Sequence, residues 1–213
     1  MAFPTTGLLD AFTRANENPL ANGTWNATNP FGSGTLCKLL SNVATGAGSF
    51  GNSYWDAATF GADTEVYFTY FTRSSQSGCH LRLQSPGTAG VDGYEALLES
   101  GNTAAAIWRI DNGAETKLGA NITTSYADGD SLGFEAIGST LTLYKKTAGS
   151  WSATDNRSDA TYGSAGNIGI AQNDTTGELD DYSGGTVVTA AGQPASKRMG
   201  GVQYAHRIAP GVW

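Results

Sequence analysis

Charged side chains are scarce in this sequence. Aspartate, glutamate, lysine and arginine make up 15% of its 213 residues, against about 25% in an average soluble protein. This fraction disfavours a helical bundle, whose outer faces carry more charge. Basic residues are scarcer than acidic ones, 12 against 19, and the net charge is −7. General nucleic-acid binding is therefore disfavoured, because phosphate contacts require a basic surface.

Cysteine and long apolar runs are also rare or missing. Cys37 and Cys79 are the only cysteines, and their spacing matches neither a disulfide framework nor a metal-binding motif. We favour two small buried side chains, with a single disulfide as the alternative. No apolar run reaches about 18 residues, so no transmembrane helix is expected. The start of the chain lacks the basic and apolar regions of a Sec signal; either a signal was removed or the protein travels without one.

Glycine and aromatic residues are abundant, with 29 glycines, 9 tyrosines, 8 phenylalanines and 5 tryptophans. Apolar and polar residues alternate with period two in many short segments, and no stretch follows the helical period. Turn residues separate about eleven or twelve such segments. The sequence therefore predicts an all-β, antiparallel fold of two sheets, a sandwich or jelly roll.

The alternation also predicts which side chains share a face. Leu81 and Leu83 are expected on one side of their strand, with His80 and Arg82 on the other. Trp108 alternates with two apolar neighbours, which favours a place in the core. We expect the two sheets to enclose Leu39, Phe68, Leu81, Leu83, Trp108, Ile110, Phe134, Leu141, Leu143 and Ile168.

The composition changes after Val188. Residues 182–213 hold 3 basic and no acidic residues, whereas residues 1–181 hold 9 basic and 19 acidic ones, a net charge of −10. We therefore divide the chain into a β-sandwich, residues 1–188, and a C-terminal arm, residues 189–213. A disordered tail is one interpretation; the apolar residues of the arm favour docking on an acidic surface. The residues expected to dock are Lys197, Arg198, Tyr204, Arg207, Ile208 and Trp213.

Three segments resemble the concanavalin A-like, laminin-G-like jelly rolls. They are DAFTRANENPL from Asp10, ADGDSLGFEAIGSTLTLYKK from Ala127, and AGNIGIAQND with LDDYSGGTV between residues 165 and 187. The resemblance covers about residues 8–188 and implies that the first strand pairs with the last. With its short appended arm, the chain also resembles the jelly-roll structural proteins of tailed phages, such as capsid decoration or fibre proteins.

This resemblance also bears on a cofactor. Jelly rolls of this kind often carry a structural calcium near the paired terminal strands, held by carboxylates and backbone carbonyls. The matching positions here are Asp10, Asp180 and Asp181. Alternatively, Asp180 and Asp181 are ordinary strand-end residues. No other cofactor is expected.

Enzymatic activity is not expected. Glucanases of this fold carry Glu-x-Asp-x-Glu on one strand, and the two glutamates act as nucleophile and acid/base. The nearest match is Glu95-Ala-Leu-Leu-Glu99, where Leu97 replaces the aspartate that would tune the charge between them. The chain also has only two histidines and no Gly-x-Ser-x-Gly motif.

Sugar binding requires aromatic faces beside polar groups. Some aromatic residues lie in expected loops or strand starts, and polar residues of the middle strands could line a groove or form a merely solvated face. The candidate ligand-binding residues are Tyr54, Trp55, Tyr67, His80, Arg82, Glu95, Arg109 and Trp151.

Two functions from different classes are compatible with these features. The first is a non-enzymatic structural or adhesion protein on a virion surface, anchored through its arm to other virion proteins or to copies of itself. The alternative is a carbohydrate-binding module of a bacterial or environmental protein, with an extracellular location. Glycans are a candidate partner in both cases, whereas nucleic acid and membranes are not.

Overall fold

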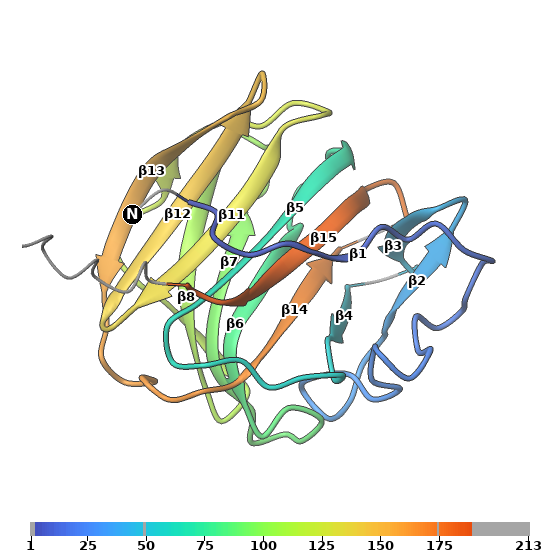
Figure 1. Cartoon of the computed structure of the whole chain (residues 1–213), viewed down its shortest axis with the longest axis horizontal. Coiled ribbons are helices and arrows are strands. Elements are labelled where there is room, and N and C mark those ends of the chain that lie inside the picture. Colours follow the sequence, from blue (N-terminus) through green and yellow to red (C-terminus); the bar gives the residue numbers. More distant parts are fainter. Residues whose placement is uncertain (1–2, 49, 174, 189–213) are drawn as a thin grey trace, which may run out of the picture.

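The computed structural model describes residues 3–48, 50–173 and 175–188 of the chain. Their regular elements are all β-strands, fifteen in number, and none of the described residues belongs to a helix that could cross a membrane. The strands form two antiparallel sheets packed face to face (Figure 1). The all-β, two-sheet prediction is confirmed. The expected arm lies outside the described residues.

The first sheet lies in front in Figure 1 and has eight strands. Its order is β13-β12-β11-β5-β15-β3-β2, and β1 pairs with β15. The strands are β1 (Leu8–Asp10), β2 (Cys37–Leu40), β3 (Val43–Gly46), β5 (Thr64–Thr72), β11 (Ser131–Ile137), β12 (Thr140–Thr147), β13 (Ser150–Ser158) and β15 (Glu178–Thr186).

The second sheet lies behind the first and has seven strands. Its order is β10-β8-β7-β6-β14-β4, and β9 pairs with β8. The strands are β4 (Gly51–Tyr54), β6 (Gly78–Gln84), β7 (Asp92–Leu98), β8 (Ala104–Asp111), β9 (Ala114–Lys117), β10 (Ile122–Thr123) and β14 (Asn167–Gln172).

Two local predictions are confirmed by the strand pairing. The first strand pairs with the last, with Leu8 opposite Ser183. Gly138 and Ser139 form the two-residue turn between β11 and β12, with Ile137 opposite Thr140. Gly138 has a φ of 54°, the left-handed conformation that tight hairpin turns require.

The main core lies between the sheets. Seven of the ten residues expected in the core belong to it: Leu39, Phe68, Leu81, Phe134, Leu141, Leu143 and Ile168. Cys37 and Cys79 are buried in the same cluster as free thiols, which confirms the favoured interpretation of the cysteines.

Leu83, Ile110 and Trp108 do not face the main core, contrary to expectation. A bulge on β6 between Leu81 and Gln84 breaks the register, so Leu83 packs with Ile110 in a separate cluster. On β8 the main core receives Ile107, and Trp108 therefore points to the outer face. Alternation predicts which residues share a face, but it does not say which face is buried.

Candidate functional site

The outer face of the second sheet carries a row of side chains in register. Each residue of the row lies directly opposite the next on the neighbouring strand, so all of them face the same way, away from the main core. From β4 to β9 the row consists of Tyr54, Gly169, His80, Glu95, Trp108 and Lys117.

The middle of this row is polar and buried. His80 Nε2 lies 3.2 Å from Glu95 Oε1, and the two side chains are 0% and 1% exposed. Neither the imidazole nitrogens nor the carboxylate oxygens have a hydrogen-bond partner, and the indole N–H of Trp108 has none either. Leaving a buried polar group unsatisfied costs about 1–3 kcal/mol. This face therefore holds hydrogen-bonding capacity that the described residues do not use.

Trp108 lies at the partly exposed end of the row. The ammonium of Lys117 is 4.6 Å from the centroid of the Trp108 ring and 2.7 Å from Glu99 Oε1. It also donates a hydrogen bond to the side-chain oxygen of Asn121. An aromatic ring, an ammonium and a carboxylate thus lie together, and all three side chains are partly exposed.

Phe31 covers the opposite end of the face. Its ring lies 6.0 Å from the His80 ring and packs on the separate cluster that includes Tyr54. Gly32 lets its loop approach closely, because a Cβ there would meet the backbone of Thr88 at 2.7 Å. No pocket is found in the part of the chain that the structure describes. The site is therefore an open surface with one covered end.

Glu115 is the titratable group of this region that responds near neutral pH. It lies on β9 opposite Ile110, two residues before Lys117. Burial and the nearby carboxylate of Glu95 raise the pKa of Glu115 to about 7, and the opposing influence of His80 is smaller. Desolvation of the carboxyl group and a like charge thus disfavour the ionised form, although the residue as a whole is exposed.

The structure brings only some of the sequence-predicted residues together. His80 and Glu95 are in contact, and Tyr54 ends their row. Trp55 belongs to the main core, with its ring 5.5 Å from that of Trp25, so it does not offer a face to a ligand. Trp55 directly follows β4 and forms an isolated β-bridge with Trp25, a non-local contact that the sequence pattern does not reveal.

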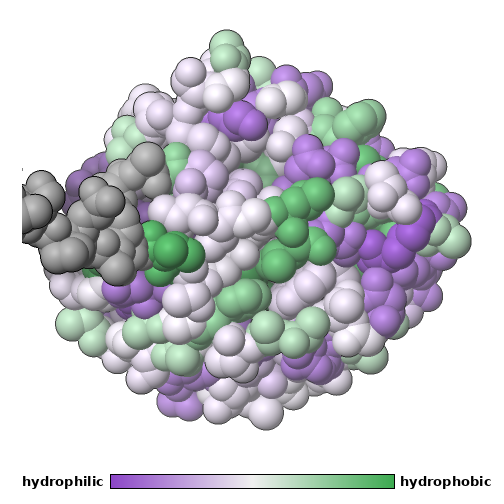
Figure 2. Space-filling model, viewed as in Figure 1, coloured by the Kyte–Doolittle hydropathy of each residue, from purple (hydrophilic) through white to green (hydrophobic). Residues whose placement is uncertain are grey.

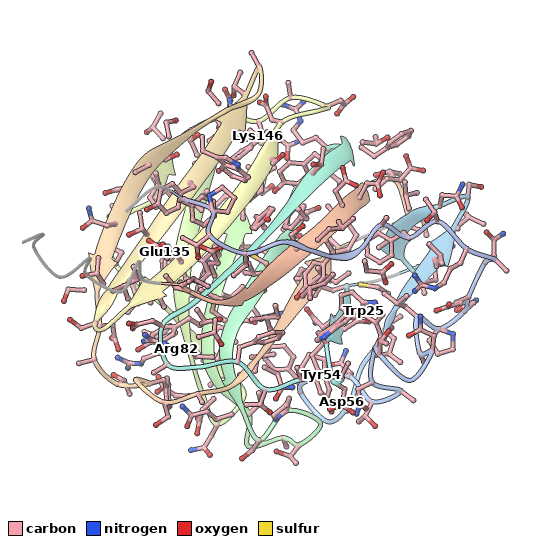
Figure 3. The ribbon with its side chains drawn as sticks, viewed as in Figure 1. Trp25, Tyr54, Asp56, Arg82, Glu135 and Lys146 are labelled. Atoms are coloured by element: carbon pink, nitrogen blue, oxygen red, sulfur yellow. The ribbon has the colours of Figure 1, made fainter. Side chains whose placement is uncertain are left out.

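The polar residues that were expected to line a groove do not share one surface. They are Tyr67, His80, Arg82, Glu95 and Arg109. Arg82 donates hydrogen bonds to the backbone oxygens of Ala62 and Tyr162, because the β6 bulge turns it away from His80. In Figure 3 the side chains of Arg82 and Tyr54 lie well apart. Arg109 pairs with two aspartates at the edge of the sandwich, and Tyr67 belongs to the first sheet.

On the outer face of the first sheet, Tyr67 and Trp151 do come together, with ring centroids 5.5 Å apart. Phe3 contacts both rings edge-on and stacks on Tyr144 at 3.9 Å. It lies directly above Gly133, where a Cβ would lie 2.5 Å from the Phe3 ring. Phe3 belongs to residues 3–6, which we term the N-terminal strap.

A carboxylate holds the strap. Glu65 Oε1 accepts the backbone N–H groups of Thr5 and Thr6 at 2.7 and 2.6 Å. Glu135, labelled in Figure 3, lies opposite Glu65 and accepts a hydrogen bond from Tyr144. Burial, together with the charge of Glu65, raises the pKa of Glu135. The polar groups of this face are thus mostly engaged within the chain.

Two of the three expected calcium ligands, Asp10 and Asp180, accept hydrogen bonds within the chain. Asp10 Oδ1 accepts hydrogen bonds from Phe12 N–H and from Arg14, and Oδ2 accepts one from the Trp25 indole. Asp180 accepts the backbone N–H of Asp181. Within residues 3–48, 50–173 and 175–188, no three His, Cys, Asp or Glu side chains are grouped to hold a metal ion. In this arrangement the three aspartates do not fit a calcium ion.

Sequence reasoning missed Trp108, Glu115 and Lys117 as site residues, although one signal could have found them. Asn112-Gly113 is a typical hairpin turn, and it sets Asp111 opposite Ala114. Counting back from this turn places Lys117 opposite Trp108.

No family model matches the chain, and no curated protein sequence does. Solved structures are similar in fold. The carbohydrate-binding module CBM66 from Bacillus subtilis has 17% identity and a TM-score of 0.54, covering 77% of this chain and 92% of its own. The exoplasmic/lumenal domain of VIP36, bound to Ca2+ and Man3GlcNAc, has 10% identity and a TM-score of 0.56, covering 86% and 92%.

A β-glucanase from Bacillus licheniformis is also similar, with 12% identity, a TM-score of 0.53, and coverage of 87% of this chain and 100% of its own. At such identities the likeness concerns the fold alone. The chain shares the two-sheet jelly-roll fold of these proteins, as the sequence resemblance implied.

Proposed function

We propose that this chain is a carbohydrate-binding module and that a glycan binds the outer face of the second sheet around Trp108. The observation that carries the proposal is a partly exposed indole ring, Trp108, with the ammonium of Lys117 and the carboxylate of Glu99 beside it. The similar structures support it, because one is a carbohydrate-binding module and another is bound to Man3GlcNAc.

The chemistry of this face suits a sugar. The apolar side of a pyranose ring stacks on an aromatic ring, and its hydroxyl groups exchange hydrogen bonds with charged side chains. Here Trp108 supplies the ring, while Lys117 and Glu99 supply a donor and an acceptor beside it. Because the surface is open, a polysaccharide chain fits it better than an enclosed monosaccharide does.

The carboxylates favour binding over hydrolysis. A retaining or inverting glycosidase requires two carboxyl groups that both reach the glycosidic bond. Glu95 is buried against His80, Glu99 is engaged with Lys117, and Leu97 stands between them. A glycan on this surface would therefore be held without cleavage.

Carbohydrate binding requires neither of two further features expected from the sequence, the structural calcium ion and the role in a virion. The VIP36 domain was solved with Ca2+, but Asp10 is committed here to Arg14 and Trp25, so the proposed binding uses side chains alone. The virion role remains a second proposal from the sequence. It depends on the arm, and none of the similar structures named above is a virion protein.

The proposal is tested by substituting Trp108→Ala in the full chain, with Trp151→Ala on the first sheet as the matched control. Binding is measured by affinity electrophoresis and by pull-down on a panel of soluble and insoluble polysaccharides. We expect Trp108→Ala to weaken binding about tenfold or more, about 1.4 kcal/mol, while Trp151→Ala retains it.

Circular dichroism of both variants checks that the fold is intact, and a reducing-sugar assay is expected to stay flat. The proposal fails if the wild-type chain binds no polysaccharide, or if folded Trp108→Ala binds as well as the wild type.

A further inference from the structure

The charges on the outer face of the second sheet do not cancel. The ionisable side chains that face outward from its strands are His80, Glu95, Glu99, Glu115 and Lys117. Among them Glu95 lies against His80, and Glu99 lies against Lys117.

Glu115 is the carboxylate left over. Among the described residues no cation forms an ion pair with it, and its nearest charged neighbour on the same strand, Lys117, is engaged with Glu99. The pKa of about 7 for Glu115 agrees with this, since burial and Glu95 both oppose its ionisation. A cation placed beside it would relieve that repulsion.

The hydrogen-bonding groups of this face have the same imbalance. Glu95 is 1% exposed and both of its oxygens lack a donor, so the face has acceptors in excess. The unpaired donors in the row are the Trp108 indole and the imidazole of His80, which carries at least one N–H. The carboxylate that a ligand can reach is Glu115, which is exposed and forms no ion pair among the described residues, so a ligand that fits brings donors and a positive charge. A protonated primary amine has three N–H donors and no acceptor.

We propose, on the basis of the glycan binding proposed above, that this site selects amino sugars: the sugar ring stacks on Trp108 and its ammonium group pairs with Glu115. The two residues are diagonal neighbours on paired strands, which places their Cα atoms about 7–8 Å apart. A ring with one amino substituent spans that distance. Glycans with carboxylate or sulfate groups are disfavoured, because they meet an unpaired carboxylate.

The test uses the full chain and three oligosaccharides of equal length: a glucosamine oligomer, its fully N-acetylated counterpart and a uronic-acid oligomer. Isothermal titration calorimetry gives each Kd. We expect the glucosamine oligomer to bind about tenfold more tightly than the N-acetylated one, and the uronic-acid oligomer to bind most weakly. Glu115→Gln should reduce the tenfold ratio to about one. Glu178→Gln on the first sheet, the matched control, should leave the ratio at its wild-type value.

The pH profile provides a second measurement. Pairing requires both an ionised Glu115 and a protonated amine. The affinity of the wild type for the glucosamine oligomer should therefore rise as the pH is raised from about 5.5 and fall again where the amine loses its proton, and Glu115→Gln should remove the rise on the acid side. If the N-acetylated oligomer binds as tightly as the glucosamine oligomer, or if Glu115→Gln keeps the preference, the amino-sugar assignment is wrong while carbohydrate binding stands. If none of the three binds and the polysaccharide panel is also negative, the proposed function itself is wrong.

Discussion

The two outer faces of the sandwich use similar residues in opposite ways. Each combines a fully buried glutamate with neighbouring aromatic rings: Glu65 with Tyr67 on the first sheet, and Glu95 with Trp108 on the second. On the first sheet the strap supplies N–H donors to Glu65 Oε1 and leaves only Oε2 unpaired. On the second sheet both Glu95 oxygens lack donors.

The difference separates a structural surface from a binding surface. The first-sheet aromatic rings already contact a ring of the same chain, Phe3. Figure 2 shows this side of the molecule, where hydrophobic residues form separate patches among polar ones. The second-sheet face instead leaves the Trp108 ring partly exposed beside Lys117 and Glu99, where a ligand can reach it.

The largest expected effect is the loss of the strap contact. Phe3→Ala should lower the free energy of unfolding by about 3 kcal/mol, as for other buried phenylalanines. Gly133→Ala should have a smaller effect of the same origin, because its Cβ would lie 2.5 Å from Phe3 and force the ring away. Chemical denaturation of both single variants and of the double variant measures this.

The double variant is the decisive one. Both substitutions act on the Phe3 ring, although the added Cβ would also lie 2.9 Å from the Trp151 ring. Their combined effect should therefore be only slightly larger than that of Phe3→Ala alone. Additive losses would show that Gly133→Ala acts through something other than the strap, and an unchanged stability of Phe3→Ala would show that the strap is not a structural element.

The overall fold could be predicted from the sequence because the signals that indicate strands and hairpins are local. Turn pairs such as Gly138-Ser139 and Asn112-Gly113 fix hairpin registers, and period-two alternation marks the strands. The bulge at Arg82 could not be predicted. It arises where β6 pairs with both β7 and β14, with register shifts on both sides, and no residue type in the segment is typical of a bulge.

The site was harder to predict, since it depends on which face of each strand is covered. Ile107 and Trp108 are adjacent and both have large apolar side chains. The pairing of β8 with β7 places Ile107 in the core, and the local sequence does not show this. The pairing of Glu95 with His80 likewise depends on a non-local register. The sequence proposed both residues as candidates but could not show that they touch.

A smaller effect is expected when the two buried glutamates are exchanged for leucine. Glu65→Leu leaves the N–H groups of Thr5 and Thr6 without their acceptor and should cost about 1–3 kcal/mol. The double substitution His80→Leu with Glu95→Leu removes both partners of a buried polar pair together, which is often neutral or stabilising. We expect its stability to stay within about 1 kcal/mol of the wild type or to exceed it.

Thermal and urea unfolding of both variants measures this contrast, and polysaccharide binding of the double variant should weaken. A large destabilisation of His80→Leu with Glu95→Leu, comparable to that of Glu65→Leu, would remove the distinction between the two faces.

The smallest effect on the fold is expected from truncation after Thr189. The contacts that close the sandwich near this point, from Val187 N–H to the backbone oxygen of Asp63 and from Val188 N–H to the hydroxyl of Thr5, remain in the shortened chain, so the melting temperature should change by about 2 °C or less. The removed residues 190–213 carry 3 basic and no acidic side chains. Attraction to the acidic body of a second copy fades beyond about 8 Å at physiological salt, so stable docking of the arm requires burial of apolar residues such as Trp213.

Light scattering at low and physiological salt should therefore show self-association of the full chain and less self-association after truncation. Equal association of both chains would rule out the arm as a docking element, and a truncated chain that melts many degrees lower would make residues 190–213 part of the sandwich.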